Sequence, residues 1–179
     1  EAARRTASLA QAGQLRDKLR LVLDLEQGVA GDGAAPGDDW EERWNALPPL
    51  DGELERTLRA RFDAALRALE EGRAAYAQLL ERNRDALLRE LLRAEIRAGI
   101  DSGPEFARER LRMQVEVLQS SLKSGHGAGH SAGHKGGQKD GHGGHAAQLR
   151  ELVALPALVD ARTASRIEQL SMRLARERQ

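Results

Sequence analysis

The chain has 179 residues, and its 28 basic residues are balanced by 28 acidic residues. Without a net charge it lacks the overall field that would attract a nucleic acid or an acidic membrane surface. It has no cysteine, which excludes disulfides, thiolate metal sites and a cysteine nucleophile. No apolar run approaches the roughly 20 residues needed to span a bilayer, and no signal peptide is visible.

The core must consist mostly of leucine and alanine, because only 3% of the residues are aromatic. Alanine buries little surface, so such a core suits helices packed in long layers better than a compact α/β domain. Apolar residues recur at helical spacing along much of the chain, and no strand pattern appears. The sequence therefore predicts an all-α protein, an extended antiparallel helical bundle with coiled-coil-like packing.

The first expected element is an amphipathic helix over residues 3–27, within an N-terminal segment 1–27. Its leucines gather mostly on one side, whereas Lys18 and its charged neighbours are expected to face the solvent. A glycine ends the helix. Residues 28–38 are small and have no apolar anchor beyond Val29, so they predict a flexible loop.

Residues 39–123 are predicted to form a helical core module that begins with a short helix over 40–47. A pair of prolines stops this helix. Trp40 and Trp44 lie one turn apart on the same face. Two readings stay open for them: a binding hot spot, or two indoles that pin the short helix to its neighbour, which we favour.

One long central helix over about 52–98 is the element around which the rest is expected to pack. Asp51 can cap its start, and the segment has no proline and one interior glycine, Gly72. At 1.5 Å per residue the helix would be about 70 Å long, too long to be wrapped into a compact domain. Its apolar seam consists of Phe62, Leu66, Leu69, Tyr76, Leu80 and Leu87.

The long helix is expected to end at Gly99, and the next helix to run over about 104–123. Ser102-Gly-Pro-Glu105 matches a capping box with proline in the first turn. Because the link is so short, the two helices are predicted to be antiparallel neighbours. The residues of the second helix that are expected to face inward are Phe106, Leu111, Val115, Leu118 and Leu122.

Residues 124–145 form a low-complexity segment rich in glycine and histidine, which predicts a disordered linker. The segment contains every histidine of the chain: His126, His130, His134, His142 and His145. Neutral imidazoles bind zinc, nickel and copper, so a second interpretation is a metal-binding tract for zinc or nickel. A defined catalytic metal site needs fixed ligands, which this composition argues against.

Residues 146–179 are predicted to form C-terminal helices. A short helix over about 146–155 is interrupted at Pro156, and a longer helix follows Asp160, which can cap it. The chain begins with glutamate rather than methionine and ends within a charged helical pattern. We therefore expect it to be a fragment of a longer protein.

Catalytic patterns are missing from the sequence. Every histidine lies in the linker tract, so no Ser/His/Asp set is available, and no glycine-rich loop follows a strand. We expect a non-enzymatic scaffold or protein-interaction module without a resident cofactor or a membrane partner. It would bind a protein partner or self-associate, for example as a homodimer, through the apolar face of the long helix. A nucleic-acid-associated role ranks third, because the arginines that would carry it are interleaved with acids.

The stretch that starts at Trp44, together with the later Arg61-Phe62 pair, resembles the bacterial repeat family called domain of unknown function 349. Members carry a tryptophan, a short proline-containing turn and an Arg-Phe pair about eighteen residues after the tryptophan, as here. Pro48 stands where glycine is commoner in the family. The resemblance covers about residues 40–98 and implies a cytoplasmic bacterial protein with repeated helical modules and no established activity. It supplies no catalytic residue; Trp44 and Phe62 are expected to pack together.

Overall fold

The computed structural model describes residues 1–125 and 140–177. Every regular element within them is a helix, which confirms the predicted all-α class. The elements are α1 (Ala2–Ala30), α2 (Trp40–Asn45), α3 (Gly52–Glu70), α4 (Arg73–Ala98), the 3-10 helix η1 (Pro104–Phe106), α5 (Ala107–Gly125), α6 (Asp140–Ala154) and α7 (Ala161–Glu177). None of the described helices combines the length and the apolar character that crossing a bilayer requires.

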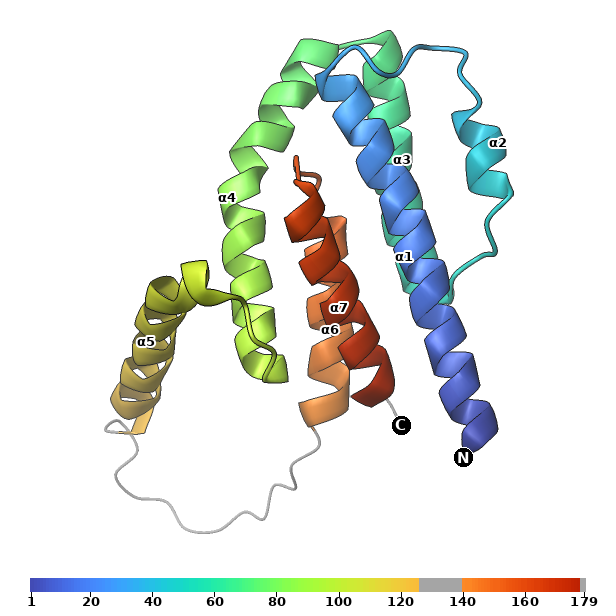
Figure 1. The fold of residues 1–179 in the computed structure, drawn as a ribbon. Helices are drawn as coiled ribbons and strands as arrows, with labels where there is room; N and C mark the ends of the chain where they lie inside the picture. The colour runs from blue at the N-terminus through green and yellow to red at the C-terminus, as the bar shows by residue number, and fades with distance from the viewer. Residues whose placement is uncertain (126–139, 178–179) are drawn as a thin grey trace.

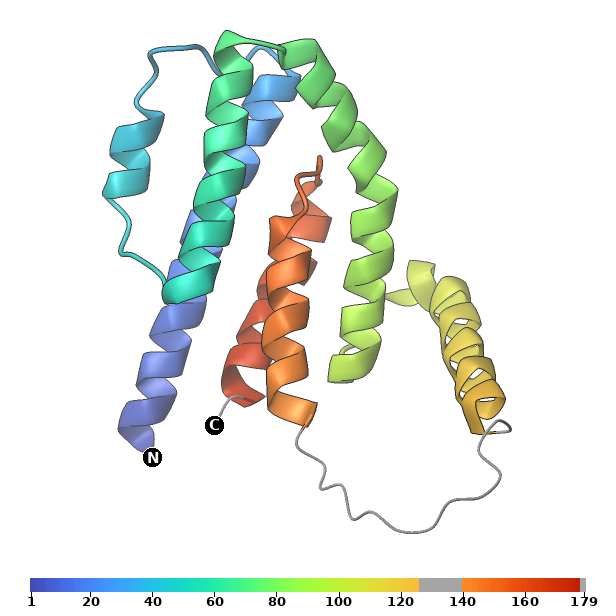
Figure 2. The ribbon, with the colours of Figure 1, turned by 180° about the vertical axis from the view of Figure 1, so that it is seen from behind.

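Two arms with a helical hairpin between them make up the body of the molecule (Figure 1). α1 and α3 lie side by side in one arm, α4 forms the other, and the arms meet where α3 ends. α6 and α7 form an antiparallel hairpin that fills the space between the arms, as the view from behind also shows (Figure 2). Buried apolar side chains from all these helices form one shared core, so the C-terminal helices complete the fold.

The single long helix predicted over 52–98 is wrong, because the structure divides it at Glu71 and Gly72. Glu71 is extended (φ −139°, ψ 129°), and Gly72 is left-handed (φ 79°, ψ 28°). Glycine adopts that conformation readily, whereas other residues are strained in it. The break lets α3 and α4 diverge around the α6–α7 hairpin and share a core with it. A straight helix about 70 Å long could not bury its apolar residues in this way.

The predicted seam continues on both sides of that break. Its fully buried members are Phe62, Leu80 and Leu87. Asn83 interrupts the seam, and its Nδ2 donates to the backbone oxygen of Pro156 (2.8 Å). The N–H of Leu158 donates to the oxygen of Leu80 (3.3 Å). The polar interruption in α4 thus attaches the link between α6 and α7.

Residues 28–38, predicted to be a flexible loop, make specific contacts. α1 continues to Ala30, and Gly28 packs so closely that a Cβ there would lie 2.6 Å from the Cβ of Ala34. The guanidinium of Arg73 donates to the backbone oxygens of Gly28 (3.4 Å) and Ala34. The missing side chain of glycine allows the loop to fold onto α1, and Arg73 holds it there.

α5 does not form the predicted antiparallel hairpin with α4. α4 ends at Gly99 in the left-handed conformation (φ 66°), as predicted, but the chain then runs back along α4 before α5 begins. Both views show α5 running in the same direction as α4 and standing apart from the other helices (Figures 1 and 2). Ser102 does not cap the new helix; its hydroxyl accepts from Arg110 Nη1 (2.8 Å), which also donates to Ile100. These bonds hold the start of α5 beside the end of α4.

Of the predicted aspartate caps, the one before α7 is present. Asp160 Oδ1 accepts a hydrogen bond from the backbone N–H of Thr163 (2.7 Å). That bond lowers the pKa of the Asp160 carboxyl below its ordinary value. The side chain of Asp51, the other predicted cap, makes no capping hydrogen bond.

Candidate interaction surface

The two tryptophans are buried and belong to the core. The expected contact between Trp44 and Phe62 is present: their ring centroids are 4.8 Å apart and their planes are tilted by 35°. Lys18 Nζ lies 4.2 Å from the centroid of the Trp44 ring. These contacts join α1, α2 and α3. Trp40 and Trp44 are therefore packing residues rather than an exposed hot spot.

Arg61 is also buried, and its guanidinium joins three helices. Nε and Nη2 donate to the carboxylate of Glu26 in α1, and Nη1 donates to the backbone oxygen of Val153 in α6 (2.9 Å). The hydroxyl of Tyr76 lies 3.4 Å from the same carboxylate. Burial raises the pKa of Glu26 against the opposing charge of Arg61, and burial also raises the pKa of Tyr76. The polar groups of this cluster bind one another, so the cluster is structural.

Two further ion pairs are shielded from solvent, and neither was anticipated from the sequence. Lys18, expected to face the solvent, is buried and pairs with Glu55 between α1 and α3. Arg166 pairs with Glu95 between α7 and α4. Helical periodicity places a charged residue on a face of its helix, but it carries no information about a partner on a distant helix.

The histidine tract lies only partly in the described part of the chain. The first three histidines are outside the described residues: His126, His130 and His134. His142 and His145 belong to α6, which begins at Asp140, so the linker predicted over 124–145 gives way to helix at its C-terminal end. Among the described residues, no group of three or more histidine, aspartate or glutamate side chains could hold a metal ion. Zinc or nickel binding by the tract stays a prediction.

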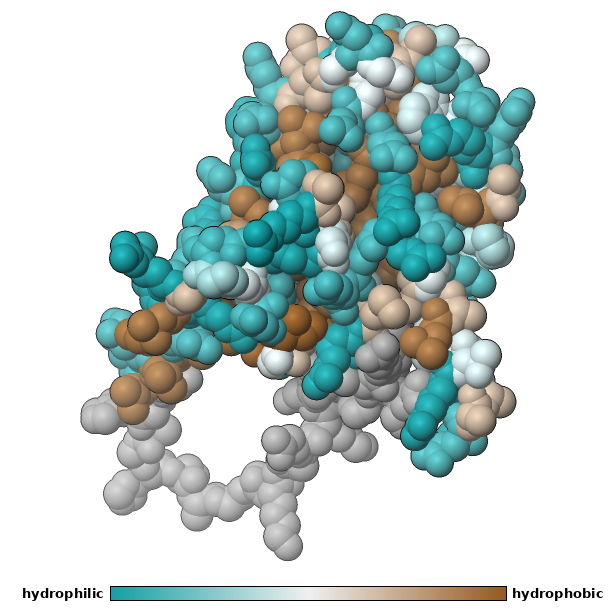
Figure 3. Space-filling model, in the orientation of Figure 1, coloured by the Kyte–Doolittle hydropathy of each residue, from teal (hydrophilic) through white to brown (hydrophobic). Residues whose placement is uncertain are grey.

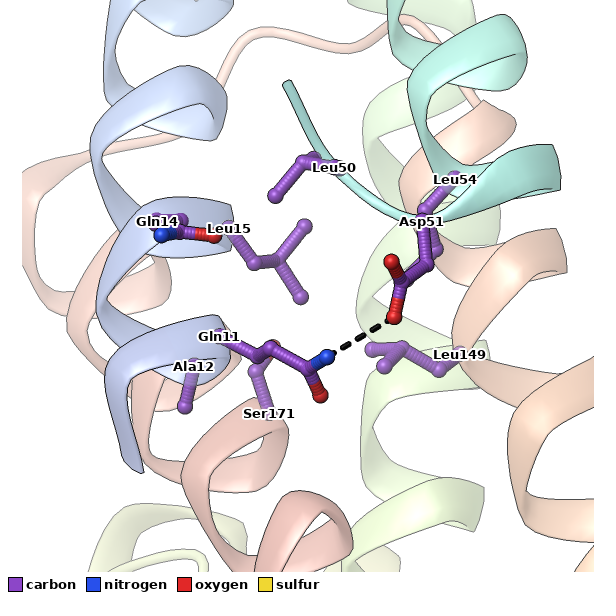
Figure 4. A pocket seen from close by; sticks show the side chains of 9 residues that line it. All are labelled: Gln11, Ala12, Gln14, Leu15, Leu50, Asp51, Leu54, Leu149 and Ser171. Atoms are coloured by element: carbon purple, nitrogen blue, oxygen red, sulfur yellow. Dashed lines mark hydrogen bonds between the residues drawn. The ribbon is translucent and has the colours of Figure 1, made fainter. Parts of the chain in front are cut away.

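A small cavity lies between α1, the start of α3, α6 and α7 (Figure 4). Its volume of about 40 Å³ would admit ordered water, whereas small-molecule sites occupy about 300–1,000 Å³. At the edge of the cavity, Gln11 Nε2 donates a hydrogen bond to Asp51 Oδ2 (2.8 Å). The Asp51 carboxylate, which was expected to cap α3, binds Gln11 instead. The apolar side chains of the lining come from Ala12, Leu15, Leu50, Leu54 and Leu149. This cavity is a packing gap rather than a substrate site.

A wider groove of about 450 Å³ lies at the bend between α3 and α4. Several alanines line it, and its charged residues, Arg67, Glu71 and Arg82, are exposed and of both signs. Exposed charges of mixed sign do not form a convergent binding set.

α5 presents a row of exposed apolar side chains, which we call the α5 ridge. The α5 ridge consists of Leu111, Val115, Leu118 and Leu122, each 43–66% exposed. Steps of four, three and four residues place these side chains within about 60° of one another around the helix axis. In the space-filling view, apolar side chains gather at the lower left, where α5 ends (Figure 3).

The prediction that the ridge residues face inward is wrong, because α5 is attached to the body through its opposite face. Met113 is buried there, about 170° around the helix from the ridge, and Arg110 binds Ile100 and Ser102 on the adjoining side. Phe106, the remaining residue expected to face inward, is partly covered and lies 4.2 Å below the guanidinium of Arg166. Apolar periodicity identifies a stripe, but not what covers it.

No protein-family model, curated protein or solved structure matches this chain. The resemblance to domain of unknown function 349 therefore stays a prediction that rests on Trp44, Arg61 and Phe62. The candidate site that the described geometry offers is the α5 ridge.

Proposed function

We propose that this chain is a non-enzymatic helical interaction module that binds an amphipathic helix of a protein partner along the α5 ridge. The observation that carries the proposal is a row of exposed apolar side chains on a helix whose other face is already attached to the body. The four side chains expose roughly 400 Å² together, comparable with the patches of about 300–600 Å² that are often functional on monomers. Covering this surface would be favourable by the hydrophobic effect.

The shape of the ridge favours a helix as its partner. The four residues occupy the a and d positions of about two heptads, the pattern of a coiled-coil seam. A row within about 60° is narrow, whereas a helix that lies on a membrane presents a broader apolar face. A single partner helix could cover the whole ridge.

The proposed surface differs from the one expected from the sequence. The apolar seam of α3 and α4 is largely covered by the other helices, so the partner would use α5 instead. The resemblance to a family of helical repeats supports a scaffold role. It also supports the bacterial cytoplasm as the proposed location.

Binding of a synthetic helix to the full chain tests the proposal. The probe is a fluorescein-labelled stapled peptide of two heptads, with leucine at a and d and glutamate at e and g. It is titrated by fluorescence anisotropy against the wild-type chain and two variants. Val115→Glu places a charge in the ridge, and Val117→Glu makes the same change at a valine that is 56% exposed and about 130° away around α5.

We expect Val115→Glu to weaken probe binding about tenfold or more and Val117→Glu to leave it within about twofold. A scrambled peptide of the same composition controls for nonspecific attraction, and circular dichroism checks that both variants keep their helix content. Equal binding of the probe to all three chains would overturn the proposal. So would the absence of binding to the wild-type chain at hundreds of micromolar.

A further inference from the structure

We infer that the helix that binds the α5 ridge is α5 of a second copy of this chain, in an antiparallel pair. The inference rests on the proposed function, because it names the partner of the same surface. Two properties of α5 point to an antiparallel second copy, the symmetry of the ridge and the distribution of charge beside it, and the small area of the ridge sets the strength of the pair.

The spacing of the ridge is the same read in either direction. In an antiparallel pair centred between Val115 and Leu118, Val115 lies opposite Leu118 of the second copy. In the same register Leu111 lies opposite Leu122. Every ridge residue therefore has an apolar counterpart, and both copies contribute the same patch, as a two-fold interface requires.

The charges beside the ridge favour the antiparallel orientation over the parallel one. Arg108 and Arg112 are exposed in the N-terminal part of α5, and Lys123 is exposed near its C-terminal end. A parallel pair would place each of these three cations beside the same residue of the second copy, and like charges oppose such contacts. In the antiparallel pair Arg108 lies opposite Gly125 of the second copy, and Arg112 lies opposite residue 121. Lys123 lies opposite Arg110, whose guanidinium is bound to Ile100 and Ser102. The antiparallel pair therefore has fewer like-charge contacts than the parallel pair. The C-terminal end of a helix is the negative pole of its dipole, which attracts Arg108 and Arg112.

The area of the ridge sets the expected strength of the dimer. Two ridges would together bury roughly 800 Å², whereas stable interfaces bury about 1,200–2,000 Å². The dimer should therefore be weak, reversible and dependent on concentration. Each copy can keep its own fold in it, because the attached face of α5 is not the paired face.

Sedimentation velocity of the full chain, from low to hundreds of micromolar, tests for the second copy. The wild-type chain and Val117→Glu should shift together toward the dimer, and Val115→Glu should stay monomeric. A wild-type chain that stays monomeric throughout overturns the inference. If the synthetic helix still binds that chain through the ridge, the proposed function stands and only the partner differs. Ridge-dependent binding to anionic vesicles without a dimer would indicate a membrane surface and likewise overturn the inference.

Disulfide cross-linking tests whether the two α5 helices are antiparallel. Introduced thiols are specific probes, because the chain has no cysteine of its own. Leu111→Cys and Leu122→Cys introduce thiols about 16 Å apart along the helix, whereas a disulfide needs Cα atoms within about 7 Å. Under mild oxidation the two variants should cross-link with each other when mixed, and neither should cross-link with itself. Self-cross-linking of each variant would indicate a parallel pair and overturn the inference, as would the absence of any cross-link.

Discussion

Replacing Arg61 by methionine is expected to destabilise the fold by about 3–5 kcal/mol, because it leaves a carboxylate buried without its partner. The Arg61 and Glu26 side chains are only 3% and 1% exposed, so water cannot replace the lost guanidinium. The substitution also removes the donor to the backbone oxygen of Val153. Both effects fall on the place where α1, α3 and α6 meet.

A double variant separates the unpaired charge from the loss of packing. Arg61→Met with Glu26→Leu leaves no buried charge at this place. The buried backbone oxygen of Val153 still loses its donor, at about 1–3 kcal/mol, and the half-buried hydroxyl of Tyr76 loses its acceptor. We expect the double variant to be about 2 kcal/mol more stable than Arg61→Met alone. The Glu26→Leu single variant completes the cycle.

Protonation gives the same prediction a pH dependence. Burial raises the pKa of Glu26, so the fold favours the protonated carboxyl. A raised pKa in the folded state contributes stability below the unfolded value of 4.5, and that contribution is lost as the pH rises through the folded value. The charge of Arg61 lowers the pKa of Glu26, so removing Arg61 raises that pKa further, and the defect of Arg61→Met should be smaller at acid pH than at pH 7.

Urea unfolding followed by far-UV circular dichroism measures all four chains of the cycle. The free energies of unfolding come from linear extrapolation to water. A loss below about 1 kcal/mol for Arg61→Met would refute the reasoning. The reasoning would also be refuted if the double variant lost as much stability as the two single variants lose together, because the two residues would then not be coupled.

Three further substitutions test other parts of the fold by the same urea assay. Trp44→Ala should destabilise by about 3–5 kcal/mol, and an unchanged stability would contradict the packing of its indole on Phe62. Gly72→Ala should cost about 1–2 kcal/mol, since an added Cβ meets nothing within 4 Å and only the left-handed backbone opposes it. The control is Gly13→Ala inside α1, which should instead stabilise the fold by about 0.5–1 kcal/mol. Equal effects of the two substitutions would contradict the left-handed break between α3 and α4. Asp160→Ala should cost about 1 kcal/mol at neutral pH. The lowered pKa means that this contribution is present above 3.8 and is lost as the pH falls through the folded value, so a cost that persists in acid would contradict the cap.

Local signals predicted those features of the fold that depend on neighbouring residues. The end of α4 at Gly99 follows from the preference of glycine for left-handed backbone, and the start of α7 follows from the capping chemistry of Asp160. The two helix ends depend on residues close in the sequence. The contact between Trp44 and Phe62, which joins α2 to α3, was expected instead from the resemblance to a family of helical repeats.

Features set by distant contacts were not predictable in the same way. Helix propensity allows the chain to continue through Gly72, and the break is favourable because it wraps both arms around the α6–α7 hairpin. From the sequence alone Lys18 is expected on the surface, because its partner Glu55 comes close only when α1 packs on α3. In α5, apolar periodicity showed the stripe, but Met113 and Arg110 decided which face meets the body.

The rate of thiol modification at two valines of α5 tests the proposed use of the ridge most directly. Val115→Cys lies in the ridge and Val117→Cys lies outside it, and both valines are exposed. At low concentration both thiols should react at the rates of accessible cysteines. The synthetic helix, at ten times its Kd, should slow the first about tenfold and leave the second within about twofold. A thiol at residue 115 that is unreactive in the free chain, or equally reactive with and without the probe, would contradict the account.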